Sequence, residues 1–362
     1  MTQTVEARPV EKPIGLTALF FGFLKVSLLG FGGGLVWARR IVVDQQRWLN
    51  DHEFAEILTL CQFMPGPNIV GITLCSGSKL RGPLGAVSAV AGFILIPWTV
   101  GLAFGSLCLH YAYLPILQNI LGGLSSAAAG LMIATGIRLL MPHRSRQTAL
   151  LFAALAFTGM VVAKLPLLGA AQHRCRRHHK RKSKNVMKDP TASLVLAAHL
   201  ALLSSISFGG FPTVLPDVRN LVTANGWATD QEFANFFAIS QVVPGPNMIL
   251  MMSFVGLKVG GILGAITSAL ATFGPPCLMY YTSYRLWDRF RDRPWQQIVR
   301  RGLAPLTIGL VIAGGYVMAR AADIGWQRAL VTAVAIGMML GTRLNPLWIL
   351  AAGGVLGGLG FV

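Results

Sequence analysis

Long apolar runs that carry almost no charge constrain this chain most. They are close to twenty residues long and lie at Leu84–Leu109, Leu114–Ile137, Thr148–Ala163, Val259–Tyr281 and Leu303–Ala319. An α-helix needs about 20 such residues to cross a hydrocarbon core of roughly 30 Å. The runs do not alternate between polar and apolar residues, so they predict membrane helices rather than the strands of a barrel.

Composition argues against two other classes of protein. Hydrophobic residues make up 54% of the 362 residues and charged residues only 12%, which argues against a soluble helical enzyme. A net charge of +18 is typical of nucleic-acid-binding proteins, but the basic residues here cluster between the apolar runs, as in the cytoplasmic loops of membrane proteins. We expect a lipid-embedded protein that binds no nucleic acid. The polar first thirteen residues do not resemble a cleavable signal, so the first span is expected to stay.

An internal repeat divides the chain into two halves. Pro-Gly-Pro-Asn occurs at residues 65–68 and again at 244–247, a constant offset of 179 residues (244 − 65). At the same offset, without gaps, the repeat pairs Trp48 with Trp227, Asp51 with Asp230, Glu53 with Glu232, Gln62 with Gln241, Lys79 with Lys258, Gly82 with Gly261 and Pro97 with Pro276. Such agreement indicates a tandem duplication.

The two halves follow one plan. We expect a polar N-terminal tail (1–14), a first repeat (15–171), a basic cytoplasmic linker (172–190) and a second repeat (191–362). Each half begins with an apolar helix that ends in Phe-Gly-Gly. A helix interrupted at Pro-Gly-Pro-Asn follows, and two or three further apolar helices complete the half. The expected fold is an all-α polytopic membrane protein with about 10–12 membrane helices.

Loop charge indicates how the halves are oriented. The segment 285–301 carries six arginines, whereas its counterpart 106–122 carries no Lys or Arg. The segment 138–146 is in turn more basic than its counterpart after Val317. Because basic loops stay in the cytoplasm, this exchange predicts that the halves are inserted in opposite orientations, as an inverted repeat.

The two Pro-Gly-Pro-Asn motifs are the strongest candidates for a substrate site. Proline removes a backbone donor and clashes with the preceding turn, and the second proline suits the start of a new helix. That new helix presents free N–H groups and the positive end of its dipole to an anion. A kink that serves packing alone is the alternative, but paired interruptions mark transporter sites. The motif residues are Pro65, Gly66, Pro67 and Asn68 in the first half, and Pro244, Gly245, Pro246 and Asn247 in the second.

Other residues near the breaks extend the candidate site. Gln62 and Gln241 lie about one helical turn before the first proline, so that with the two asparagines they provide four amide donors without fixed charge. The alternative role for these amides is hydrogen bonding between helices. Two glycine motifs end the first helix of each half, where they either expose N–H groups to an anion or allow close helix contact. They are Phe31-Gly32-Gly33 and Phe208-Gly209-Gly210.

Charged residues lie at the outer ends of the broken helices. Lys79 and Lys258 either draw an anion to the entrance or extend to the membrane interface, and we favour the second role. Glu53 and Glu232 are candidate proton carriers. However, Asn50-x-x-Glu53 and Thr229-x-x-Glu232 each fit a capping box at a helix start, which we favour. Asp44 and Asp217 are weaker alternative carboxylates.

The sequence indicates neither a metal, a cofactor nor an enzyme. The only dense group of metal-ligating residue types lies among eight Lys and Arg residues in the linker, where cationic repulsion disfavours a metal. Its members are His173, Cys175, His178 and His179. The chain also lacks a nucleotide-binding loop, a catalytic triad and a metalloprotease motif.

Together these features resemble the chromate transporter (CHR) family in its two-domain form. The resemblance rests on the tandem halves, the Phe-Gly-Gly helix ends, the Trp-x-x-x-x-Glu-Phe sequence that begins at Trp48, and the paired Pro-Gly-Pro-Asn breaks. It covers nearly the whole chain. It implies efflux of chromate from the cytoplasm, coupled to the proton gradient, in a bacterial inner membrane, and hence chromate resistance. The short members of the family, which work as pairs, are similar to single halves of this chain.

Three functions remain open from the sequence. The preferred hypothesis is a secondary active exporter that holds chromate between the helix ends at Asn68 and Asn247. Chromate and sulfate are both tetrahedral dianions, so an uptake or exchange carrier for sulfate or another small anion is the first alternative. A membrane scaffold without transport is the second, although polar residues at paired helix breaks disfavour it.

Overall fold

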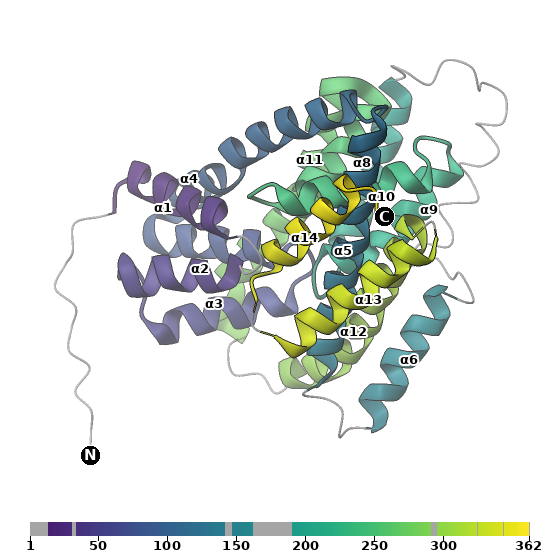
Figure 1. Ribbon diagram of the computed structural model, residues 1–362. Helices are drawn as coiled ribbons and strands as arrows, with labels where there is room; N and C mark the ends of the chain where they lie inside the picture. Colours follow the sequence, from purple (N-terminus) through teal and green to yellow (C-terminus); the bar gives the residue numbers. More distant parts are fainter. Residues whose placement is uncertain are drawn as a thin grey trace.

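The computed structural model describes residues 14–30, 34–141, 147–161, 190–290, 295–323, 325–342 and 344–361. Every regular element in these ranges is helical (Figure 1). The first half contains α1 (Leu16–Leu29), α2 (Gly34–Arg39), α3 (Asp51–Phe63), α4 (Asn68–His110), α5 (Pro115–Leu140) and α6 (Gln147–Val161). The second contains α8 (Pro190–Ser205), α9 (Leu215–Ala224), α10 (Asp230–Val242), α11 (Asn247–Phe290), α12 (Trp295–Ala322), α13 (Trp326–Gly341) and α14 (Pro346–Gly358). The prediction of an all-α protein is confirmed.

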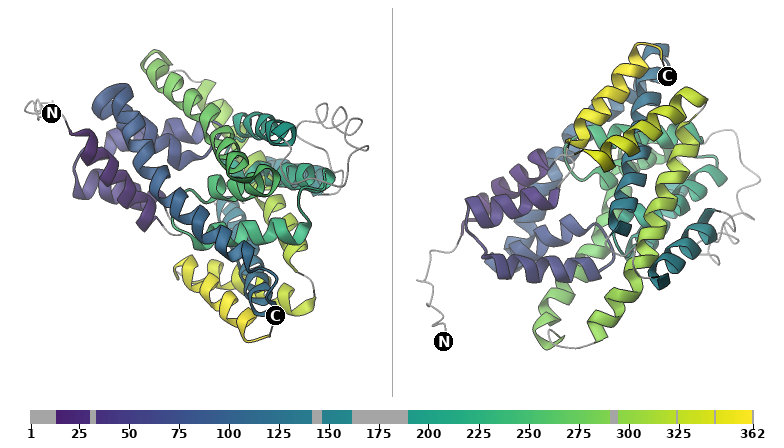
Figure 2. Two further views of the ribbon diagram at one scale, coloured as in Figure 1. Left: turned by 90° about the horizontal axis from the view of Figure 1, so that it is seen from above. Right: turned by 60° about the horizontal axis from the view of Figure 1, so that its bottom comes forward.

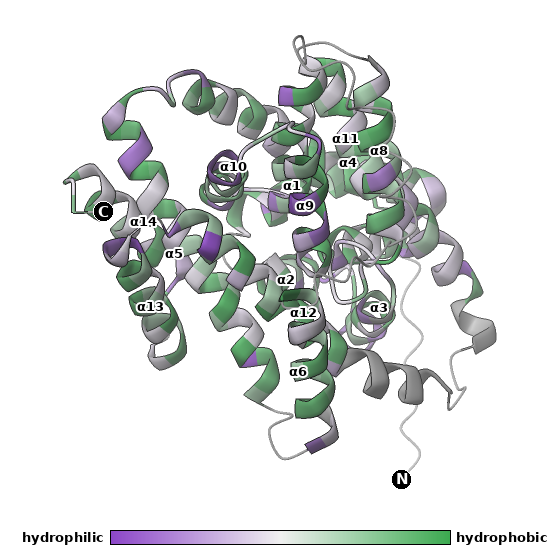
Figure 3. Cartoon of the chain, turned by 90° about the vertical axis from the view of Figure 1, so that its right-hand side faces the viewer, coloured by the Kyte–Doolittle hydropathy of each residue, from purple (hydrophilic) through white to green (hydrophobic). Residues whose placement is uncertain are grey.

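Several of these helices have the length and apolarity of membrane spans. By length and composition, the spans in the described ranges are Asn68–His110, Pro115–Leu140, Asn247–Leu286 and Pro305–Ala322, and five shorter apolar helices accompany them. Large hydrophobic side chains point outward from them, as lipid-facing residues do. Figure 3 shows hydrophobic residues along α6, α12 and α13, and hydrophilic residues gathered at α9 and α10. Nearly all of the predicted linker lies outside the described residues, and α8 begins at its last residue, Pro190.

Each Pro-Gly-Pro-Asn break reverses the chain. Glu53 lies near the start of α3, before the break, and Lys79 lies about the same number of residues after it, in α4. Their side chains are nevertheless 3.2 Å apart. If the two helices were collinear, about 40 Å would separate these residues. The segment 51–80 is therefore a helical hairpin, called hairpin 1, whose tip is formed by residues 64–67. An ion pair between Glu232 and Lys258 closes the equivalent hairpin 2 (residues 230–259), whose tip is residues 243–246.

The long helices α4 and α11 contain a second reversal. The dihedral angles are non-helical at Arg81 and Gly82. A Cβ added at Gly77 would lie 2.4 Å from the carbonyl oxygen of Gly85, whereas eight residues of straight helix span about 12 Å. The long arm of α4 (residues 83–110) thus runs back along hairpin 1. In α11 the same turn occurs at Gly261, and the long arm of α11 (residues 262–290) follows it.

The contacts between the halves give their relative direction. Along the long arm of α4, Pro97 approaches Gly245 and Gly105 approaches Phe254, so this arm runs parallel to the first segment of α11. That segment runs antiparallel to the long arm of α11. The two long arms, which are equivalent in the repeat, therefore run in opposite directions, as the predicted inverted repeat requires. Figures 1 and 2 show α1 to α3 on one side of the molecule and α9 and α10 on the other.

Small residues bring the remaining helices together. Gly123 of α5 meets the backbone of Gly353 in α14, and Gly309 of α12 meets the backbone of Ala153 in α6. Between α5 and α13, the Thr332 hydroxyl donates to the carbonyl of Ser126 at 3.1 Å. Close backbone approach and hydrogen bonds of this kind hold helices together in lipid, where the hydrophobic effect between them is weak. They fix the scaffold on which both hairpins rest.

Candidate functional site

A cavity of about 400 Å³ lies beside the tip of hairpin 2. Both halves contribute to its wall. Its polar groups come from Ser27, Thr135, Gln241 and Asn247. The rest of the wall is mostly apolar and includes Val26, Phe93, Met132, Phe237 and Val311. Among the described residues that line it, none carries a charge.

The tip of hairpin 2 faces this cavity with donors. Gln241, Asn247 and the three residues of Pro244-Gly245-Pro246 all line it. The side-chain amide of Asn247 donates to that of Gln241 at 3.0 Å, which bridges the break. The Asn247 N–H, expected to be free, donates to the Gly245 carbonyl at 3.0 Å. In the described part of the chain the N–H groups of Met248 and Ile249 have no backbone acceptor, as in the first turn of any helix.

The tip of hairpin 1 is filled by protein. Pro67 lines the cavity, whereas Pro65 and Gly66 are buried outside the lining and Gln62 is exposed. With its amide nitrogen facing the carbonyls, Asn68 donates to Cys61 and Gly66, each at 3.2 Å. Its amide also lies 3.5 Å from the hydroxyl of Tyr280. We expect the second proline of the motif to be the first residue of the new helix. In the structure Pro67 is instead the N-cap, and α4 begins one residue later, at Asn68.

Each tip packs against the opposite half. A Cβ added at Gly66 would lie 2.4 Å from Pro276 Cβ, and one at Gly245 would lie 2.8 Å from Pro97 Cβ. Pro97 and Pro276 are equivalent in the repeat, so the two contacts are related by its approximate two-fold symmetry. Both glycines have a positive φ, +115° and +128°, which other residues rarely adopt. Glycine is therefore needed at both tips for its conformation and its small size.

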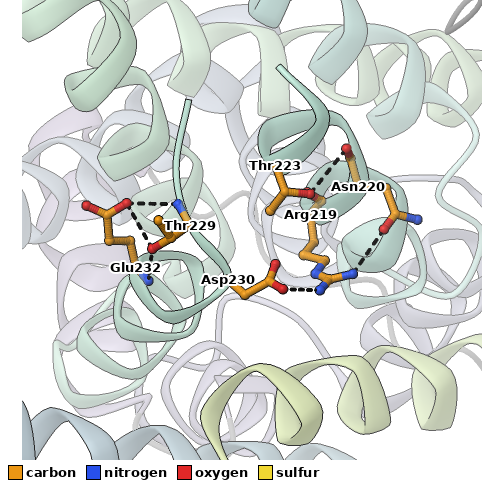
Figure 4. Close-up of polar contacts among 6 residues, drawn as sticks. All are labelled: Arg219, Asn220, Thr223, Thr229, Asp230 and Glu232. Atoms are coloured by element: carbon orange, nitrogen blue, oxygen red, sulfur yellow. Dashed lines mark hydrogen bonds and ion pairs between the residues drawn. The ribbon is translucent and has the colours of Figure 1, made fainter. Parts of the chain in front are cut away.

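The predicted lysines and glutamates lie at the hairpin bases and not in the cavity. Both capping boxes are present, with Glu53 accepting from the Asn50 N–H and Glu232 from the Thr229 N–H. Figure 4 shows the second box beside the pair of Arg219 and Asp230. Partial burial raises the pKa of Glu232, but Lys258 and the Thr229 hydrogen bonds outweigh it and hold that pKa below its ordinary value.

The other candidates of the sequence lie apart from the cavity or outside the described residues. Phe208-Gly209-Gly210 packs on α12, where Thr307 donates to the Phe208 carbonyl at 3.3 Å. Phe31-Gly32-Gly33 is outside the described residues, although its neighbours Gly30 and Gly34 line the cavity. Asp44 pairs with Arg39 at the surface, and Asp217 is buried in the first turn of α9.

No metal site is found within the described ranges, and the His173 cluster lies outside them.

Sequence reasoning missed three residues. Ser27 and Thr135 line the cavity, but a single hydroxyl in an apolar helix has no distinctive pattern. Tyr280 fills the tip of hairpin 1, and this one had a signal. Its repeat equivalent is Gly101, so the alignment of the two halves already contains a change from glycine to tyrosine near the breaks.

Two inverted halves whose broken helices meet beside a cavity lined with neutral donors define a polytopic membrane transporter. Both halves match the family model described as Chromate transporter, at residues 17–172 and 194–358. The chain therefore belongs to the chromate transporter family.

Individual relatives agree with this match. A chromate transport protein of Pseudomonas aeruginosa is 28% identical over 347 residues, which cover 85% of this chain and 82% of the relative. A chromate transport protein of Cupriavidus metallidurans is 24% identical over 372 residues, 95% of this chain and 92% of the relative. The uncharacterized transporter YwrA of Bacillus subtilis is 25% identical over 171 residues, which cover 46% of this chain but 96% of YwrA. No solved structure matches the chain.

Proposed function

We propose that this protein is a secondary active transporter that exports chromate across a bacterial inner membrane. The match of both halves to the chromate transporter family carries the proposal, and the names of the Pseudomonas and Cupriavidus relatives support the substrate. The cavity adds a physical reason. Its amides, hydroxyls and helix N-terminus are donors, which suit the oxygens of a tetrahedral oxyanion.

Membrane electrostatics favour export over uptake. A potential that is negative inside drives each negative charge outward with about 2.3 kcal/mol per 100 mV, so a dianion gains roughly twice that amount. Uptake would have to overcome the same energy. We place the basic linker (172–190) in the cytoplasm, because basic loops stay on that side.

The inverted repeat provides a route for alternating access. The helices of each hairpin are about 20 Å long, which is too short to span the hydrocarbon core, so both tips lie within the membrane. The tips approach from opposite sides and rest on each other's long arms. A small rocking of one half against the other would open the cavity to one side at a time, with the ion held at the tips.

We propose the two carboxylates at the hairpin bases as candidates for proton coupling in addition to their capping role. Glu53 and Glu232 each pair with a lysine, and the lowered pKa of Glu232 keeps it ionised near neutral pH. Glu232 therefore takes up a proton only when its pair with Lys258 opens. Glu53→Gln and Glu232→Gln should reduce flux driven by a pH gradient and leave flux driven by a chromate gradient largely intact. If the proton-driven component is unchanged in both variants, another group carries the proton.

The direct test is chromate flux in proteoliposomes, with and without an imposed pH gradient. We expect chromate movement that accelerates when protons flow in the opposite direction, together with weaker competition by sulfate. Faster transport of sulfate than of chromate would favour the sulfate carrier. An absence of flux for every oxyanion tested would favour a scaffold.

The position of the site is tested by the paired asparagines. Wild type should protect a chromate-sensitive host, and the double variant Asn68→Ala/Asn247→Ala should protect much less at equal abundance in the membrane. Equal protection would show that the anion is held elsewhere.

A further inference from the structure

We propose that the two breaks, although alike in sequence, have different roles. The anion binds at the tip of hairpin 2, where Ser27 is one of its ligands. The tip of hairpin 1 is then a closed structural contact. This inference rests on the proposed oxyanion transport and assigns its binding site to one of the two motifs. It also adds a binding residue from α1, outside both motifs.

The asparagine side chain and the glycine N–H at the tip of hairpin 1 are used inside the protein. The side chain of Tyr280 is 0% exposed and occupies the space beside the tip. A Cβ added at Gly71 would lie 2.6 Å from its ring, and one at Gly66 would lie 3.4 Å from it. The Gly66 N–H donates to the Ser207 carbonyl of the other half at 3.1 Å. Asn68 is turned toward the carbonyls of its own hairpin. At this break only Pro67, Ile69 and Val70 border the cavity, and none of them has a polar side chain that could bind an anion.

Hairpin 2 lacks the equivalent plug. The residue that corresponds to Tyr280 is Gly101, which has no side chain to cover the tip. The space beside this tip is the 400 Å³ cavity, and residues 243–249 form part of its wall. The positive end of the α11 dipole and the N–H groups of its first turn are directed there.

Ser27 points independently to a ligand in this cavity. It is only 2% exposed, and among the described residues its hydroxyl has no hydrogen-bond partner. That oxygen lies 3.7 Å from where a Cβ of Gly245 would be, at the tip of hairpin 2. A buried hydroxyl without a partner is destabilising, so its presence at this position is explained if a bound ion accepts from it.

The repeat supplies an internal comparison. With the two-residue gap that aligns the Phe-Gly-Gly motifs, Ser27 corresponds to Ser204. Ser204 is also buried, but its hydroxyl donates to the carbonyl of Thr272 within its own half. The position of Thr272 is occupied in the first half by Phe93, which lines the cavity. One serine therefore serves the packing of α8 on α11, and the other faces the cavity.

These groups select the class of ligand. Neutral donors in an apolar wall stabilise a small oxyanion without the strong attraction of a lysine or arginine, so that the ion can also leave. The volume of about 400 Å³ accommodates such an ion with part of its hydration water.

The test compares Ser27→Ala with Ser204→Ala in the purified full chain. Binding of potassium chromate, and of sulfate in parallel, is read from the anion concentration that raises the melting temperature. Ser27→Ala should require about tenfold more anion, as expected from the loss of a hydrogen bond to a charged group, with an unchanged or higher melting temperature without anion. Ser204→Ala should do the reverse, with a lower melting temperature and the wild-type anion requirement.

Equal anion requirements for wild type and Ser27→Ala would overturn the assignment and leave the proposed transport function intact. If sulfate but not chromate stabilises wild type, the chromate proposal fails while the role of Ser27 is still read with sulfate. If neither anion stabilises any of the three proteins, both proposals are overturned.

Discussion

At several positions that correspond in the two repeats, one half has a large side chain and the other has glycine. These differences make the site asymmetric although the sequence is duplicated. On the long arm of α11, the large Tyr280 faces Gly71. The corresponding pair on the other side of the repeat is the small Gly101 facing Leu250. Each contact thus pairs one large residue with one glycine, so the packed volume is similar. In one contact the large residue lies on the long arm, and in the other it lies on the hairpin. The consequence is that one tip is covered by an aromatic ring and the other remains beside a cavity.

The tip glycines should not tolerate a side chain. Gly245→Ala combines a positive φ with a clash against Pro97 Cβ at 2.8 Å. The matched control is Gly261→Ala, which also has a positive φ but meets nothing within 4 Å. We expect the control to cost about 1–3 kcal/mol from backbone strain alone, and Gly245→Ala to cost clearly more. Melting temperatures in detergent measure both, and equal losses would contradict the contact between the halves.

The hairpins illustrate what sequence can and cannot predict about an element. The positions of the breaks and of the capping boxes follow from Pro-Gly-Pro-Asn and from Asn50 and Thr229, because those rules are local. The reversal of the chain at each break does not follow, since a proline shows where a helix ends and not where the next one points. That direction is set by contacts between residues far apart in sequence, such as Glu53 with Lys79.

The candidate site shows the same limit. Asn247 and Gln241 were predicted, because they belong to the motif that interrupts the helix. Ser27 was not, since its role depends on a cavity that forms only when α1 packs beside the other half. The different environments of Asn68 and Asn247 also arise from tertiary contacts, as their local sequences are nearly the same.

Hairpin 1 can be tested by cross-linking. Cys61 on α3 interacts with Cys75 on α4, across the two helices of the hairpin. A variant that keeps only these two of the five cysteines should form an intramolecular disulfide with a membrane-permeable oxidant, detected by mass spectrometry of its peptides. A control that keeps only Cys61 and Cys108 should form none, because these two belong to separate clusters of the core. A straight helix through the break would give no Cys61–Cys75 product.

At the scale of the whole molecule, the central claim is that the two halves are inserted in opposite orientations and so bring their breaks to one place. Loop charge predicted this orientation, and the contacts of Pro97 with Gly245 and of Gly105 with Phe254 agree with it, because they run in the same order along both helices. A parallel arrangement would place both hairpin bases on the same side of the membrane, and the long arm of α4 would run antiparallel to the first segment of α11. The transport cycle that we propose depends on the opposite arrangement.

Single cysteines at the two hairpin bases test this claim most directly. Asp51 and Asp230 are equivalent in the repeat, their side chains are 72% and 47% exposed, and neither belongs to a capping box. Asp51→Cys and Asp230→Cys would be made separately in a protein without native cysteines and treated in intact cells with a membrane-impermeant thiol reagent. The account predicts that one of them reacts from outside and that the other reacts only after the membrane is permeabilised; labelling of both from the same side would contradict it.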